Sequence, residues 1–148
     1  MKITTTRIIR FGLLIAWLGL TIFLSEQTGV ESARLSVRIT NWIVRVFPSK
    51  IEYTRLHGIL RELAHFGIHF ILAILAYRAL ITIFHERTSI VIGLLFCGIV
   101  AIVDELLQIR IIGRARESFD LLLNLFGVSL GTNLSYLISK PLIPKTPR

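Results

Sequence analysis

Four long runs of apolar residues divide this chain, and they constrain its fold more than any other feature. The runs cover about residues 8–24, 63–84, 89–109 and 119–138. Each is long enough to cross the hydrocarbon core of a bilayer, which takes roughly 17–25 helical residues. The polar residues of the last three runs lie near the run ends, not along one side as in a soluble helical bundle. The sequence therefore predicts an all-α membrane fold with four transmembrane helices.

The composition favours the same class and excludes others. Of the 148 residues, 53% are hydrophobic and only 18% are charged, although the formal net charge is +8. The basic residues are spread between the apolar runs and form no patch interleaved with aromatic residues, so we expect no nucleic-acid partner. The single cysteine, Cys97, excludes an internal disulfide framework and a multi-cysteine metal site. The length predicts one domain, 1–148, and no cofactor is expected.

The N-terminal run has two interpretations. Lys2, Arg7 and Arg10 give it the basic start of a secretory signal peptide. However, Ser25-Glu26-Gln27 follows the run, and this is not a small-residue cleavage site. A retained span is therefore the preferred interpretation, and a cleaved signal is the alternative. With an even number of spans both termini lie on one side, and the basic residues before the first span favour the cytoplasm.

The long segment between the first two spans predicts an amphipathic helix over about residues 33–47. One face carries Leu35, Ile39, Trp42, Ile43 and Val46, and the opposite face carries Arg34, Arg38, Asn41 and Arg45. Such a helix suits the headgroup layer of a membrane, with its arginines facing water. A lid packed over the bundle, without a lipid role, fits the same periodicity.

Polar residues from four separate stretches lie toward the same side of the predicted membrane. Ionisable groups at span ends are costly and are usually paired or functional. We therefore expect one ligand-binding pocket made by Ser25, Gln27, Arg61, His65, Asp104, Glu105, Gln108, Arg114, Asp120 and Asn124.

Helical spacing supports this convergence. Arg61, His65 and His69 follow one another at four-residue intervals, so they line one face of the second span. Gly127 and Gly131 form a small-xxx-small motif, which we interpret as a packing surface between helices.

Together these residues resemble the VanZ-like family of bacterial integral membrane proteins. The matching pieces are Ser25-Glu26-Gln27, Arg61-Glu62-Leu63-Ala64-His65-Phe66, Asp104-Glu105-Leu106-Leu107-Gln108, Gly113-Arg114 and Asp120-Leu121-Leu122-Leu123-Asn124 followed by Gly127. The resemblance covers nearly the whole chain. It implies a multi-pass protein of the bacterial cytoplasmic membrane and a link to the cell envelope, because the name-giving member is associated with resistance to the glycopeptide teicoplanin. It implies no particular reaction.

The chain departs from that family at five positions. Glu62 stands where the family usually has Lys, and Ile68 and His69 stand where it often has a Glu-Tyr pair. Leu107 replaces a common His, and Ile112 replaces a common Pro. These departures remove one acid and one histidine from the polar cluster.

A binding module is the first hypothesis for this cluster. Arg61, Arg114 and Arg116 would hold a phosphate or carboxylate, since a guanidinium fork matches both groups. The acids Asp104, Glu105 and Asp120 would orient the arginines, and His65 would hydrogen-bond the ligand. The candidate partners are membrane lipids, lipid-linked wall precursors and the glycopeptide itself.

A membrane hydrolase or transferase acting on a phosphate-linked headgroup is the alternative. His65 would be its base or nucleophile, oriented by Asp104 or Glu105. Ser25 is a weaker candidate nucleophile, because serine at a helix end is more often a cap. Two further interpretations stay open: a metal site of His65, His69 and Glu105, and a buried ion-pair network that only sets helix register.

Overall fold

The computed structural model describes residues 2–46, 52–110 and 118–139, and the regular secondary structure of these residues is all α-helix, joined by short turns. Five helices follow one another, α1 (Lys2–Ser25), α2 (Gly29–Val46), α3 (Tyr53–Leu80), α4 (Glu86–Ile109) and α5 (Ser118–Ser139). All except α2 are long and apolar enough to cross a membrane. The predicted fold class, four membrane-spanning helices and one shorter helix between the first two, is confirmed.

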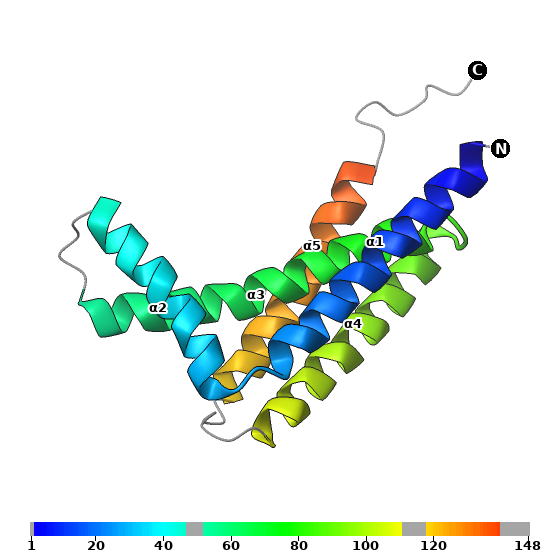
Figure 1. The fold of residues 1–148 in the computed structure, drawn as a ribbon. Coiled ribbons are helices and arrows are strands. Elements are labelled where there is room, and N and C mark those ends of the chain that lie inside the picture. Colours follow the sequence, from blue (N-terminus) through cyan, green and yellow to red (C-terminus); the bar gives the residue numbers. More distant parts are fainter. Residues whose placement is uncertain (1, 47–51, 111–117, 140–148) are drawn as a thin grey trace.

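Helix α3 is the centre of the arrangement, because it contacts each of the other four helices. Figure 1 shows α1, α4 and α5 running alongside one another while α3 crosses them obliquely. The first part of α3 extends out of this bundle next to α2. The start of α1 and the end of α5 lie at one end of the bundle, and the turn between α1 and α2 lies at the other.

The closest helix packing is between α3 and α5, and two glycines allow it. A Cβ atom at Gly127 would lie 2.6 Å from the carbonyl oxygen of Phe66, and one at Gly131 would overlap the carbonyl oxygen of Phe70. Only residues without a side chain let two backbones approach this closely. The prediction that Gly127 and Gly131 form a packing surface is confirmed.

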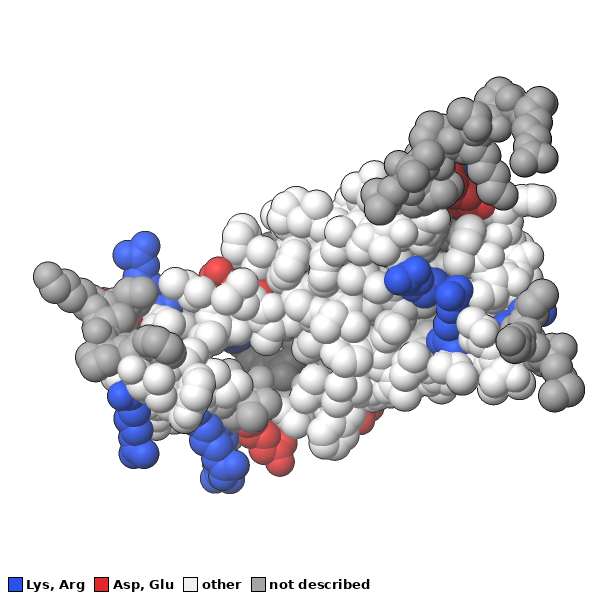
Figure 2. Space-filling view, turned by 90° about the horizontal axis from the view of Figure 1, so that it is seen from above, with Lys and Arg blue, Asp and Glu red and all other residues white. Residues whose placement is uncertain are grey.

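The bundle has a thin core and an apolar exterior. The core cluster consists of Leu14, Leu72, Ala73, Ala76, Ala79, Cys97 and Val128, most of them small. Large apolar side chains on the spans, such as Ile15, Leu95 and Leu122, are exposed. In Figure 2 the charged side chains gather toward the two ends of the molecule, with an uncharged band between them. This distribution suits a helical bundle that is surrounded by lipid.

Helix α2 begins at Gly29, four residues before the predicted start at residue 33, because Thr28 and Glu31 form a capping box. The backbone N–H of Thr28 donates to Oε2 of Glu31 at 3.0 Å, and the backbone N–H of Glu31 lies 3.3 Å from Oγ1 of Thr28. This reciprocal pair satisfies amide groups that the first helical turn leaves without partners. The Thr28 backbone bond lowers the pKa of the Glu31 carboxyl from its usual value.

The apolar face of α2 is exposed, so the structure does not support a lid that packs this face over the bundle. Ile39, Trp42 and Val46 are all exposed, with Trp42 at 62%. Ser32 and Ser36 instead line cavities with residues of α3. Small polar side chains therefore bring α2 against α3, while its larger apolar side chains point elsewhere.

Candidate functional site

A cavity of about 100 Å³ lies where the last turn of α1, the start of α2 and the facing parts of α3 and α4 meet. Its position is the end of the bundle away from the start of α1. Six of the ten predicted ligand-binding residues line it, namely Ser25, Gln27, Arg61, His65, Asp104 and Gln108. The polar residues of separate stretches are thus brought around one space.

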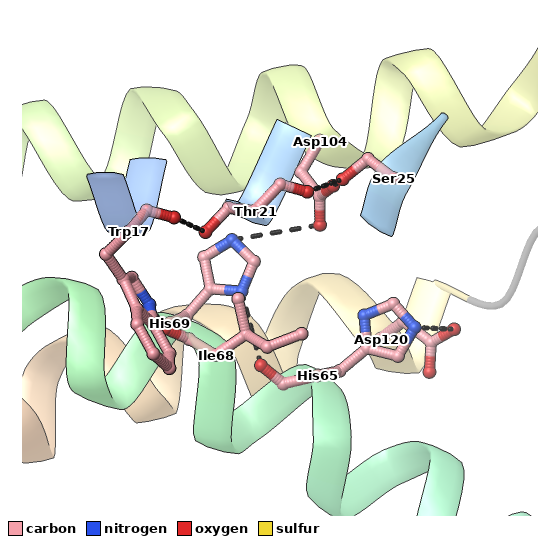
Figure 3. A network of polar contacts seen from close by, with 8 residues as sticks. All are labelled: Trp17, Thr21, Ser25, His65, Ile68, His69, Asp104 and Asp120. Carbon is pink, nitrogen blue, oxygen red and sulfur yellow. Dashed lines mark hydrogen bonds and ion pairs between the residues drawn. The ribbon is translucent and has the colours of Figure 1, made fainter. Parts of the chain in front are cut away.

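Asp104 of α4 is held by side chains of two other helices. The hydroxyl of Ser25, the last residue of α1, donates to Oδ1 of Asp104 and also lies 2.8 Å from the carbonyl oxygen of Thr21. From α3, Nε2 of His69 lies 3.8 Å from Oδ2 of Asp104 (Figure 3). Because a buried carboxylate is costly without partners, this cluster ties α1, α3 and α4 together at the cavity.

The tautomer of His69 follows from its second contact. Its Nδ1 lies 3.2 Å from the carbonyl oxygen of His65, and a carbonyl can only accept, so Nδ1 carries a proton. In the neutral ring Nε2 would then be an acceptor facing the acceptor oxygens of Asp104. The approach of Nε2 to Oδ2 of Asp104 is therefore favourable only when one of these two atoms carries a proton that the other accepts.

Asp120, in the first turn of α5, makes the second acidic cluster. The Arg61 guanidinium donates from Nη2 to Oδ2 of Asp120 at 3.0 Å, and Nε2 of His65 lies 3.7 Å from the same oxygen. The Asp120 side chain is almost completely buried, whereas that of Arg61 is 37% exposed. Asp120 thus holds Arg61 and His65, both of which line the cavity.

The two imidazoles of α3 contact different acids. The imidazole of His65 lies beside Asp120, and Asp104 faces His69 (Figure 3). The orientation of His65 by Asp104 or Glu105 stays a prediction. A step of four helical residues rotates the side chain by about 40° and moves it about 6 Å along the axis. The two imidazoles on α3 therefore face different helices, His65 toward α5 and His69 toward α4.

The remaining predicted residues lie elsewhere. Glu105 and Asn124 are buried but do not line this cavity. Both side-chain polar atoms of Asn124 lack a hydrogen-bond partner in the part of the chain that the structure describes. Arg114, predicted to bind ligand, and Arg116 fall within 111–117, outside the described residues.

Sequence reasoning missed the contribution of α2. Ser32 and Ser36 line the cavity, and Thr40, four residues further on, is fully buried. The signal was available, because three small hydroxyl residues at four-residue intervals share one helix face. It was overlooked because the apolar and basic faces of the same helix dominate the periodicity.

The chemistry of the cavity is that of hydrogen bonding and charge. Donors from Arg61, His65 and Gln108 face the same space as the carboxylate of Asp104. Among the described residues, no group of three His, Cys, Asp or Glu side chains is placed to hold a metal ion. His65, His69 and Glu105 therefore do not form the metal site considered from the sequence.

The chain was compared with known proteins. The family model described as VanZ/LLP1 matches residues 11–139, from the first span to the end of α5. No curated protein and no solved structure was found to match the chain.

Proposed function

The chain belongs to the VanZ/LLP1 family of multi-pass membrane proteins, and from this premise we propose that it binds an anionic ligand in the polar cavity at the end of its bundle. The ligand is a lipid-linked or other cell-envelope molecule. The observation that carries the proposal is the position of Arg61, which is fixed by Asp120 yet partly exposed at the cavity. A guanidinium has five donors in a fork that matches phosphate and carboxylate groups.

The proposed binding has a direct test in cells. Lipids and wall precursors would be compared in cells with the protein, in cells without it, and in cells with Arg61→Gln or His65→Ala. The species that co-purify with the wild-type chain and with each variant would then be identified. We expect one anionic species to co-purify with the wild-type chain, and to be lost from both variants while expression is preserved. Asn133→Ala, at an exposed position on α5, is the matched control. Retention of the same species by both cavity variants would refute the proposal.

An effect on glycopeptide susceptibility is part of the same proposal. It is supported only by family membership, since the name-giving member is associated with teicoplanin resistance. Teicoplanin inhibition would be measured in the same strains, with the cavity variants expected to match the deletion strain. Equal susceptibility of all strains would remove teicoplanin from the proposal and leave the envelope ligand.

The cavity is proposed to face the outer leaflet, with both termini in the cytoplasm. Lys2, Arg7 and Arg10 precede the first span, which favours this orientation. Single cysteines would be introduced at the exposed positions Asn41 of α2 and Thr88 of α4 in a chain with Cys97→Ala. On intact cells an impermeant maleimide should label the Asn41→Cys chain and not the Thr88→Cys chain. The reverse pattern would invert the orientation.

A membrane hydrolase or transferase is the second candidate. It is favoured by the acid–histidine pair of Asp120 and His65, in which a carboxylate lies beside Nε2 of a possible base. Arg61 on the same carboxylate would stabilise negative charge that develops on a phosphate-linked headgroup. Ser25 is a poor nucleophile here, because its hydroxyl faces Asp104 and not an imidazole. Turnover of such a headgroup by the purified chain, abolished by His65→Gln, would support catalysis; saturable binding without turnover would support the binding module.

A further inference from the structure

A second cavity, of about 70 Å³, lies between α2 and α3 and adjoins the first. Its lining includes Ser32, Ser36, Arg61, His65 and Gln108, all of which also line the larger cavity. A buried water needs roughly 10–15 Å³, so this space can take a group several times larger. We call it the α2–α3 compartment.

His57 is the residue that distinguishes the α2–α3 compartment. It lines this space but not the larger cavity, and it lies four residues before Arg61 on the same face of α3. Its Nε2 atom is buried and has no hydrogen-bond partner within the described residues. A buried polar atom without a partner is costly, so a ligand that bonds Nε2 would relieve that cost.

The charge of the lining selects the sign of the ligand. Asp104 lines the larger cavity, whereas the described residues that line the α2–α3 compartment include no Asp or Glu. Three side chains on one face of α3, His57, Arg61 and His65, supply nitrogen donors instead. Arg61 and His65 also contact the buried carboxylate of Asp120, which does not line the compartment. The side chains that face this space therefore favour an anion over a cation.

Helix α2 adds further donors from the opposite wall. Ser32 and Ser36 bring hydroxyl groups to the lining, and Gly29 brings the first turn of the helix without a side chain in between. The capping box already occupies the N–H of Glu31, and the N–H of Ser32 donates to the carbonyl oxygen of Thr28, so the serine hydroxyls are the groups that α2 offers to a ligand. Phosphate oxygens suit donors that approach from two sides, because a phosphate can accept several hydrogen bonds at once.

We propose that the α2–α3 compartment binds the phosphate of a phosphate ester, with His57, Arg61 and His65 on one side and the hydroxyls of Ser32 and Ser36 on the other. The inference rests on the proposed anion-binding function. It names phosphate esters as the ligand class and adds His57 to the residues that bind the ligand. The apolar part of a lipid phosphate would extend toward Leu24, Ala64 and Ile68, which line the adjoining larger cavity. A soluble phosphate would occupy the α2–α3 compartment alone.

The test uses the purified full chain in detergent and native mass spectrometry. The probes are phosphatidic acid, diacylglycerol with the same acyl chains, and inorganic phosphate. We expect phosphatidic acid to be retained and diacylglycerol not. His57→Ala should weaken retention about tenfold, as for the loss of one hydrogen bond to a charged group, and His57→Lys should restore it. His85→Ala, at an exposed position at the start of α4, is the matched control.

The outcomes distinguish a soluble phosphate from a lipid phosphate. They also distinguish failure of this inference from failure of the proposed function. Displacement of phosphatidic acid by millimolar inorganic phosphate, or retention of phosphate alone, supports a soluble source; retention without displacement supports a lipid source. Equal retention of diacylglycerol, no retention of any phosphate, or no effect of His57→Ala in a chain with unchanged thermal stability overturns the inference. The proposed function would survive that result if an anionic species still co-purified from cells and was lost from the Arg61→Gln and His65→Ala variants.

Discussion

The Arg61 guanidinium and the Asp120 carboxylate form an ion pair of 3.0 Å that connects α3 to the first turn of α5. The same carboxylate oxygen lies 3.7 Å from Nε2 of His65. One buried acid therefore orients two side chains of the cavity. Because the acid lies behind both of them, its replacement should disturb the cavity without removing any group that lines it.

The coupling between Arg61 and Asp120 can be measured by a double-mutant cycle. Arg61→Gln, Asp120→Asn and the double variant would be compared by thermal unfolding in detergent. Since Asp120 is buried and Arg61 is partly exposed, we expect a coupling free energy of about 1 kcal/mol. Additive effects of the two substitutions would contradict a stabilising ion pair.

The α3–α5 contact should be the part of the fold most sensitive to a single methyl group. Gly131→Ala would place Cβ against the Phe70 carbonyl, so we expect a loss of about 1–3 kcal/mol in unfolding free energy. Gly19→Ala is the matched control, since a Cβ atom there meets nothing within 4 Å. It should be neutral or slightly stabilising because alanine favours helices. Equal effects of the two variants would argue against the observed helix packing.

The hydroxyl of Ser25 should contribute to stability through Asp104. Ser25→Ala removes a donor from a buried carboxylate, for which we expect a loss of about 1–3 kcal/mol. Ser129→Ala, at an exposed position on α5, should change the thermal midpoint little. If Ser25→Ala resembles that control, Asp104 does not depend on Ser25.

The capping box of α2 should make the start of this helix sensitive to acid. The Thr28 backbone bond lowers the pKa of the folded Glu31 carboxyl below its value in an unfolded chain. Its stabilising contribution is then complete above the unfolded pKa near 4.5 and is lost as the pH falls through the lowered folded value. Glu31→Ala should lower the protection factors of the first α2 turn at pH 7, and acid should lower them in the wild type once the slower intrinsic exchange at low pH is divided out. Protection factors that are unaffected by both changes would count against the box.

The exposed face of α2 predicts contact with a lipid surface. Trp42 is exposed on this face, so in a Trp17→Phe background it reports on α2 alone, because the chain has two tryptophans. We expect lipids brominated near the headgroup to quench its fluorescence. Replacing Arg34, Arg38 and Arg45 with Gln should reduce the preference for anionic lipids. The absence of quenching would show that α2 lies away from the membrane.

Local features of the chain were sufficient to predict its helices. Apolar run length predicts a span, and the spacing of Gly127 and Gly131 predicts a close helix contact, because both depend on residues near one another in the sequence. Helix ends were less well predicted. The apolar run predicts a second span from residue 63, but α3 begins at Tyr53. The polar first part of this helix, which includes His57, lies before the apolar run and is not predicted by it. The Thr28–Glu31 capping signal was likewise overlooked.

The partners of the polar side chains were decided by the tertiary structure alone. Residue spacing predicts that His65 and His69 share a helix face, but the rotation and crossing of α3 determine that one meets Asp120 and the other Asp104. The same holds for α2, whose faces are evident from its periodicity although only packing shows that the serine face lies against α3. Such pairings depend on the relative orientation of whole helices, which arises from contacts along their full length and is not encoded in any short segment.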